Sequence, residues 1–128
     1  MNDTNDEIIT IPVEMPLTVW NEKVDYISVR TDDASLEDND EFWDGEFRTL
    51  LGKAVKLLGE SAKYESLITA IAVEDKDMRL DYLSALTINL IGGRVWYDYI
   101  FEAGKLIGNF DVHLRGTPDG KIEFVEMT

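Results

Sequence analysis

A run of carboxylates interrupted by two aromatic residues carries the most distinctive chemistry of this chain. Residues 31–46 read TDDASLEDNDEFWDGE and contain no lysine or arginine. The acidic side chains are Asp32, Asp33, Glu37, Asp38, Asp40, Glu41, Asp44 and Glu46. Carboxylates at this density could bind a divalent cation, stand in for the phosphates of a nucleic acid, or simply keep the protein in solution.

The spacing within the run does not match a calcium-binding EF-hand loop. That loop needs oxygen ligands at its first, third, fifth and twelfth positions and a glycine at the sixth. With Gly45 placed sixth, the third and twelfth positions fall on Phe42 and Leu51, whose side chains have no oxygen. We therefore expect no metal ion or other cofactor.

No pattern of residues elsewhere indicates an enzyme. Cysteine is absent, His113 is the only histidine, and no serine lies in a GxSxG motif. Asp98 lies close to Trp96, Tyr97 and Tyr99, so a small ligand or a sugar could bind around residues 96–99. An ordinary solvent face of an antiparallel sheet has the same pattern. We expect no catalysis, and we expect His113 to be exposed.

The negative charge is concentrated in the first third of the chain. The formal net charge is −14. Residues 1–46 hold 14 acidic side chains against Lys23 and Arg30, a net of −12, and residues 47–128 carry the other −2. Such a field repels nucleic acids and anionic membranes and speeds encounter with a basic protein. We expect no direct binding to nucleic acid or membrane; solubility alone is the competing explanation.

Length and composition indicate one globular domain over residues 1–128. A 128-residue chain with 45% hydrophobic residues can bury a core without crosslinks or metals. Its start, MNDTNDEIIT, lacks the basic and apolar parts of a secretion signal. No run approaches the ~18 apolar residues of a membrane span. We expect a cytoplasmic protein whose residues 1–6 fray.

The acidic run leads into the helix that must position it, which we predict over residues 40–58. Apolar residues recur there at three- and four-residue steps and form one stripe: Trp43, Phe47, Leu50, Leu51, Ala54, Leu57 and Leu58. Carboxylates near its start complement the helix dipole, and Gly59 is placed to end it. We expect Trp43 mainly in the core and residues 31–40 as an acidic loop.

Strands are predicted on both sides of this helix. Residues 7–13 and 24–30 indicate an N-terminal hairpin, with Pro12 typical of an edge strand. Between 61 and 93 the periodicity is ambiguous, and we favour a short helix over 62–73 and a strand over 84–91 against the reverse assignments.

The last third of the chain predicts a meander. Its strands are 94–101, 106–115 and 121–127, with turns at 102–105 and 117–120. In the last strand we expect Ile122, Phe124 and Glu126 to share one face. The fold class is therefore α+β: a single domain with an antiparallel sheet of five or six strands packed on the helix at 40–58.

The leading functional hypothesis is a small inhibitor or immunity-type protein, as in a toxin–antitoxin pair. The eight carboxylates, together with Trp20, which we expect in a loop as an exposed aromatic anchor, would bind a basic protein such as a nuclease toxin or a nucleic-acid-handling complex. Charge mimicry and occlusion would mask the nucleic-acid groove of that partner. The alternatives are an assembly module that binds or homodimerises through an aromatic sheet face, and a small hydrolase or ligand-binding domain around residues 96–99.

Overall fold

The computed structural model describes residues 7–19, 22–59, 80–103 and 110–127. The helical segments are η1 (Ala34–Asp38, a 3₁₀ helix), η2 (Phe42–Glu46, a π-helical segment) and α1 (Phe47–Leu58). The strands are β1 (Ile9–Val13), β2 (Thr18–Val19), β3 (Glu22–Lys23), β4 (Tyr26–Thr31), β5 (Leu80–Ile91), β6 (Arg94–Ala103), β7 (Phe110–Gly116) and β8 (Ile122–Met127).

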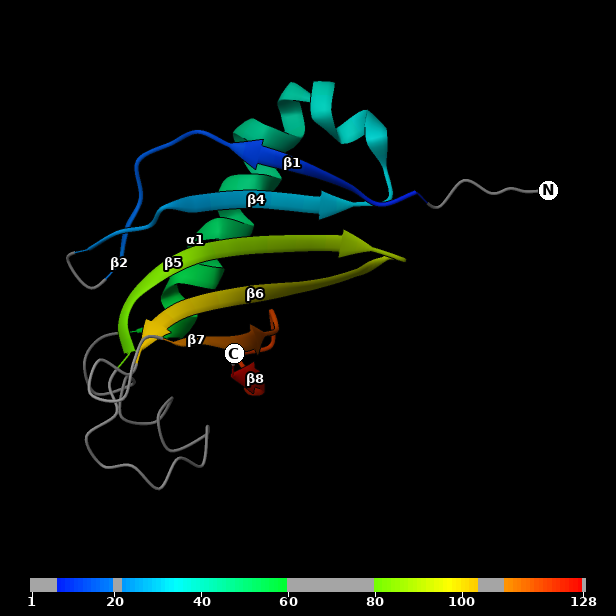
Figure 1. Ribbon diagram of the computed structural model, residues 1–128. Coiled ribbons are helices and arrows are strands. Elements are labelled where there is room, and N and C mark those ends of the chain that lie inside the picture. Colours follow the sequence, from blue (N-terminus) through cyan, green and yellow to red (C-terminus); the bar gives the residue numbers. More distant parts are fainter. Residues whose placement is uncertain (1–6, 20–21, 60–79, 104–109, 128) are drawn as a thin grey trace.

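In the described part of the chain, six strands form one sheet in the order β1-β4-β5-β6-β7-β8, and α1 lies across one face of it (Figure 1). Neighbouring strands are antiparallel except β4 and β5, which are parallel. A parallel pair requires a long crossover, and this crossover contains the acidic run and α1. The predicted α+β class, with a sheet packed on the helix that follows the acidic run, is confirmed for the described residues, but the sheet is mostly and not entirely antiparallel as predicted.

The predicted N-terminal hairpin is confirmed as the antiparallel pair β1 and β4. Its connection holds an additional two-stranded ribbon, β2 with β3. Pro12 lies in β1, which is an edge of the sheet. An edge strand has one side without a partner, which is why a sheet tolerates proline in its edge strands.

The predicted helix over 40–58 is also confirmed, and it ends as expected at Gly59. Gly59 has φ of 63° and ψ of −154°, a combination open almost only to glycine. On the other side of the crossover the strand prediction for 84–91 is correct, and β5 starts earlier, at Leu80. The helix favoured for 62–73 lies outside the described residues.

The C-terminal meander is confirmed, with two differences in detail. Residues 102 and 103 continue β6 instead of turning. In β8 the pairing shifts by one residue, so that Phe124 lies opposite Leu114 while Glu126 lies opposite His113. A shift of one residue moves a side chain to the other face. Glu126 therefore lies on the face of His113 and does not share the face of Ile122, so the prediction that these two residues share a face is wrong.

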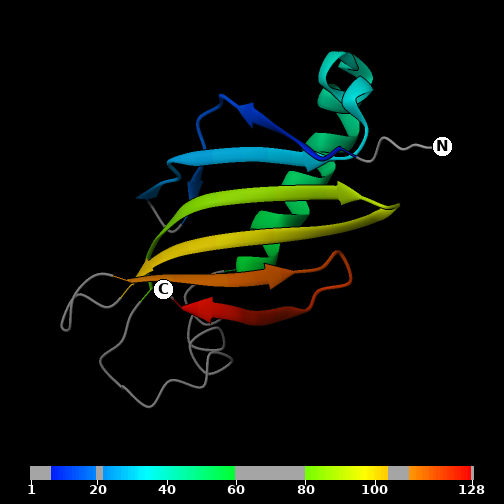
Figure 2. The ribbon, with the colours of Figure 1, turned by 45° about the vertical axis from the view of Figure 1, so that its right-hand side comes forward.

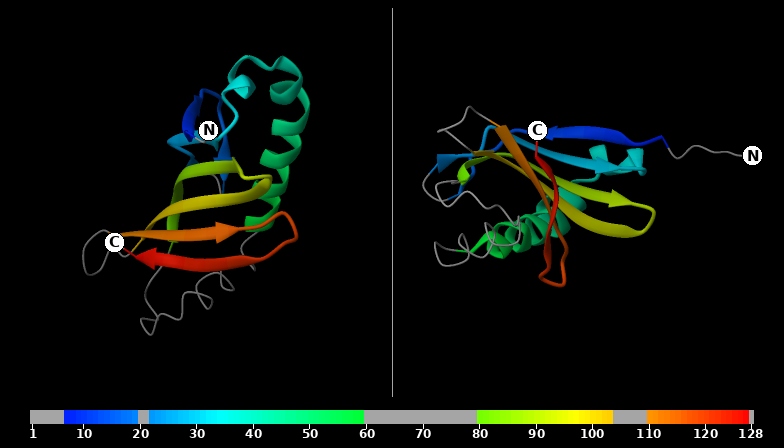
Figure 3. Two further views of the ribbon diagram at one scale, coloured as in Figure 1. Left: turned by 90° about the vertical axis from the view of Figure 1, so that its right-hand side faces the viewer. Right: turned by 60° about the horizontal axis from the view of Figure 1, so that its bottom comes forward.

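The core lies between α1 and one face of the sheet. Alternating residues of the strands point to it, among them Ile27, Val29, Leu86, Ile88, Tyr97, Tyr99, Phe101, Val112 and Leu114. From α1 the apolar stripe meets them with Phe47, Leu50, Leu51, Ala54, Leu57 and Leu58. Figure 3 shows the opposite face of the sheet, which no helix of the described residues covers. We call it the open face.

Candidate protein-binding surface

The acidic run starts where β4 ends and crosses that end of the sheet before it enters α1. Figure 2 shows this segment close to the tip where β5 turns into β6. The backbone N–H of Gly92, at the tip, donates a hydrogen bond of 2.9 Å to Asp32 Oδ2. Gly92 and Gly93 both have positive φ, 62° and 73°, which the tight two-residue turn requires. Asp32 thus ties the start of the acidic run to the hairpin of β5 and β6.

Residues 31–40, expected as a loop, contain the short helix η1 because Asp33 caps it. Asp33 Oδ1 accepts hydrogen bonds from the backbone N and the Oγ of Ser35, at 3.0 and 2.6 Å. The backbone N–H of Asp33 donates in turn to Thr31 Oγ1, at 3.0 Å. Local side-chain bonds of this kind order a segment that the hydrophobic periodicity leaves unassigned.

Trp43 joins η1 to the start of the helix. Its indole N–H donates to the carbonyl oxygens of Leu36, at 2.8 Å, and Glu37, at 3.2 Å. The ring is half-buried and packs against the hydrophobic core, where the helical spacing predicted it. The ring centroid of Phe47 lies 5.0 Å away. Trp43 is therefore both a core residue and the link that orders η1.

The π-helical segment η2 brings Phe42 into the core, which the period of 3.6 residues did not predict. The backbone N–H of Phe47 donates a hydrogen bond to the carbonyl of Phe42, five residues earlier in the chain. This widening aligns residues five apart on one face of the helix. Phe42 is 4% exposed and its ring centroid lies 6.3 Å from that of Phe47. The aromatic residues at 42, 43 and 47 together anchor the acidic run to the core.

The carboxylates themselves point to solvent. Asp32 is half-buried, and the other seven acidic side chains of the run are exposed. Within the described part of the chain, no lysine or arginine forms an ion pair within 4.0 Å of any of them. The eight predicted residues are thus solvent-accessible along one connected segment, without a lysine or arginine ion-pair partner among the described residues. Trp20, the ninth predicted residue, lies outside the described residues.

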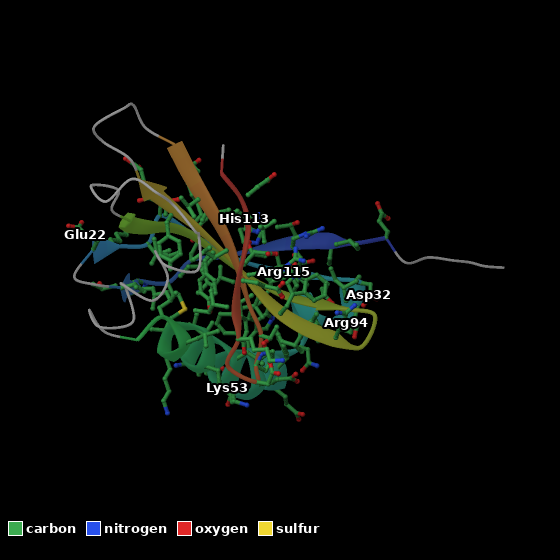
Figure 4. All side chains as sticks on the ribbon, turned by 90° about the horizontal axis from the view of Figure 1, so that it is seen from below. Glu22, Asp32, Lys53, Arg94, His113 and Arg115 are labelled. Carbon is green, nitrogen blue, oxygen red and sulfur yellow. The ribbon has the colours of Figure 1, made fainter. Side chains whose placement is uncertain are left out.

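A shallow groove that the sequence did not indicate lies within this surface. It has a volume of about 290 Å³ and is bounded by η1, the helix start and the tip of the β5–β6 hairpin. Its apolar lining comes from Leu36, Phe42, Leu90 and Val95. The charged residues that line it are Asp32, Asp33, Glu46 and Arg94. Figure 4 shows Asp32 beside Arg94 at this end of the molecule.

The open face of the sheet carries a second polar cluster, centred on Asp98. Its Oδ1 lies 2.9 Å from His113 Nε2 and accepts a bond of 3.3 Å from Arg115 Nε. Its Oδ2 accepts a 2.8 Å bond from the amide of Asn89, whose Oδ1 accepts from Arg30 at 3.3 Å. His113 is therefore paired and only 21% exposed, so the expectation of a simply exposed histidine is wrong. The cross-strand pairing that builds this cluster joins β4, β5, β6 and β7.

The hypothetical ligand site around residues 96–99 is divided between the two faces of the sheet. Trp96 and Asp98 lie on the open face, whereas Tyr97 and Tyr99 are fully buried toward α1. Burial raises the pKa of both tyrosine hydroxyls, and at Tyr99 the nearby Tyr97 adds to the shift. The four side chains therefore do not converge on one ligand, because successive residues of a strand point to opposite sides.

Neither metal binding nor a membrane span is indicated in the parts described. No three His, Asp or Glu side chains among those residues are arranged to hold a metal ion. Nor is any helix in the same ranges both long and apolar enough to cross a bilayer. Comparison with protein-family models, with curated proteins and with solved structures finds no match for this chain. The functional argument rests on the geometry above.

Proposed function

We propose that this chain is a non-catalytic binding protein whose acidic surface, residues 31–46, covers a basic surface of a partner protein. One observation carries the proposal: the backbone that carries the carboxylates is held by hydrogen bonds although the charges repel one another. Acids that served only solubility would need no fixed position, and fixing a residue costs roughly 1–2 kcal/mol of conformational entropy. Here Asp32, Asp33 and Trp43 order the run through specific hydrogen bonds. Preorganisation of this kind lowers the cost of binding.

The chemistry of the surface indicates the class of partner. A row of exposed carboxylates presents negative charge much as the phosphates of a nucleic acid do, so the complementary surface is one that binds nucleic acid. The expected partner is a basic enzyme such as a nuclease toxin or a component of a nucleic-acid-handling complex. The chain would inhibit it by occupying its substrate groove, with no chemical step of its own.

The test begins with capture of partners from a lysate of the source cell, followed by affinity measurement with the purified partner at low and high salt. Charge-driven binding weakens steeply between about 50 and 500 mM salt, because the Debye length shortens from more than 10 Å to a few ångströms. A fourfold reversal in the acidic surface should weaken binding about 100-fold or more and flatten the salt dependence. The variant carries lysine at four exposed positions: Glu37, Asp38, Glu41 and Asp44.

A matched control separates the surface from the total charge. Lysine at Glu7, Glu14, Glu22 and Glu123 changes the net charge equally, at exposed positions outside the acidic run. At low salt this control variant should bind the partner with most of the original affinity. Its binding should still weaken as the salt concentration rises. Equal loss of affinity in both variants, or an affinity that neither changes, would contradict the proposal.

A second candidate function uses the open face of the sheet. Tyr26 at its end is 73% exposed. Trp96 lies on the same face, and the guanidinium carbons of Arg94 and Arg115 lie 5.9 and 5.7 Å from the centroid of its ring. Tyr97, Tyr99 and Phe101 are buried, so an interface here would depend on Tyr26 and Trp96. Sedimentation tests it: a dimer that persists at high salt and dissociates in Tyr26→Ala would favour the sheet face over the acidic surface.

A further inference from the structure

We infer that the groove between η1, the helix start and the β5–β6 tip receives one arginine side chain from the basic partner. This inference rests on the proposed function and names the contact that anchors it. The groove is lined by Leu36, Phe42, Leu90 and Val95 together with three carboxylates. It therefore combines an apolar floor with a negative rim.

Size restricts what the groove can hold. Pockets for cofactors and drug-sized ligands have volumes of about 300–1,000 Å³ and enclose most of the ligand. The volume here, about 290 Å³ in a shallow depression, is at the lower end of that range. It accommodates a single side chain better than a small organic cofactor. Interfaces commonly concentrate their binding energy in such a place, where one anchor residue of the partner is buried.

Charge selects a cationic side chain among those that fit. Asp32, Asp33 and Glu46 on the rim outweigh Arg94, and the exposed carboxylates of the rest of the run surround them. An acidic or neutral anchor would gain nothing from this field. A basic surface that meets residues 31–46 also offers mainly arginine and lysine.

Between these two, the lining favours arginine. Its three-carbon stem can lie on the apolar lining of the groove, and its planar guanidinium can bond two carboxylate oxygens at once. Glu46 is exposed on the rim and makes no capping hydrogen bond to its own helix, so its carboxylate is available to a partner. Lysine, a more strongly hydrated point charge, should bind the same place more weakly.

The test uses Nα-acetyl-arginine amide as the probe, titrated into the full chain and followed by amide chemical shifts in NMR spectra. Shifts should concentrate on the groove, at the amides of Leu36, Gly93 and Val95. The lysine amide should produce the same pattern with weaker binding, and the uncharged norleucine amide should produce little. Shifts spread over the whole acidic run, or none at all at high probe concentration, would overturn the inference.

Two single variants provide the matched comparison. Glu46→Gln removes a rim carboxylate, whereas Asp44→Asn removes one from the same helical turn that does not line the groove. Both residues are exposed, and both variants change the net charge equally. Glu46→Gln should weaken probe binding about fivefold and Asp44→Asn less than twofold. Equal weakening in the two variants would mean that the probe is attracted by the total negative charge and not by the groove, and would overturn the inference.

The outcome separates the inference from the proposed function. If the groove fails this test while the fourfold reversal still abolishes salt-dependent partner binding, the acidic surface binds without an arginine anchor. If the partner ignores the fourfold reversal, the proposed function fails whatever the probe does.

Discussion

Two tyrosines of β6 that point to the same side of the sheet differ in what their hydroxyl groups contact. Tyr99 donates a 2.7 Å hydrogen bond to the carbonyl of Ala54 in α1. The hydroxyl of Tyr97 is buried without a hydrogen-bond partner among the described residues. Both side chains are fully buried. A comparison of the two therefore measures how much one hydrogen bond between the sheet and the helix contributes to stability.

The two Tyr→Phe variants should therefore differ in stability. Tyr99→Phe loses a satisfied bond and should lower the free energy of unfolding by about 1 kcal/mol, whereas Tyr97→Phe removes a desolvated hydroxyl and should leave stability equal or slightly higher. Urea unfolding monitored by circular dichroism measures both. Equal losses would mean that the hydroxyl of Tyr97 makes a bond that the structure does not show.

The same hydroxyls predict a loss of stability in alkali. Burial raises the pKa of both in the folded state above the ordinary value of about 10. Above that pH the unfolded chain releases these protons while the folded protein retains them. The contribution of these protonated hydroxyl groups to the free energy of unfolding is therefore complete below about pH 10. It declines as pH rises, by at most about 1.4 kcal/mol per pH unit for each group.

The measurement is the free energy of unfolding between about pH 9 and 11. Replacing both Tyr97 and Tyr99 by phenylalanine should make the decline shallower. An unchanged slope in that double variant would show that other groups cause the alkaline loss.

At the level of elements, the acidic run is ordered by its link to the helix. Trp43 connects η1 to η2 through its indole N–H and packs on Phe42 and Phe47 through its ring. These two functions can be separated, because phenylalanine retains an aromatic ring but has no N–H donor.

Trp43→Phe should loosen η1 with little effect on the sheet. The amides of Leu36 and Asn39, which donate within η1 to the carbonyls of Asp33 and Leu36, should exchange with solvent about fivefold faster, the equivalent of roughly 1 kcal/mol. The amides of β5 and β6 are the internal control and should keep their protection. Unchanged exchange in η1 would mean that Asp33 alone holds it.

At the level of the whole molecule, the negative charge is concentrated in the first third of the chain. The sheet and helix bury an ordinary core, while 14 acidic side chains against two basic ones occupy the first 46 residues. Carboxylates close together on an ordered surface repel one another more in the folded state than in the expanded chain. The acidic surface therefore lowers the stability of the free protein.

Added salt should consequently stabilise the protein. Screening weakens this repulsion, so we expect Tm to rise by several degrees between about 0.01 and 0.5 M sodium chloride. The fourfold lysine variant at Glu37, Asp38, Glu41 and Asp44 should start with a higher Tm and show a smaller rise. If that variant responds to salt as the original chain does, the repulsion lies elsewhere.

Local patterns in the sequence were sufficient for most elements of the fold. The apolar stripe from Trp43 to Leu58 defines a helix, Gly59 ends it, and Gly92-Gly93 turns one strand into the next. Each depends on neighbours within a few residues, where the backbone geometry of one residue type decides the outcome. The charge of the acidic run is likewise a property of composition alone.

Contacts between distant residues decided the rest. The hydrogen bond of Asp32 to Gly92, the groove beneath η1 and the cluster around Asp98 each join segments that the chain separates widely. Alternation along β6 already places Trp96 and Asp98 on one face and Tyr97 and Tyr99 on the other, which the hypothesis of a site at 96–99 overlooked. Which strands pair, and in what register, depends on packing over the entire core. Composition therefore determined the charge of this protein, and the tertiary structure determined where that charge is held.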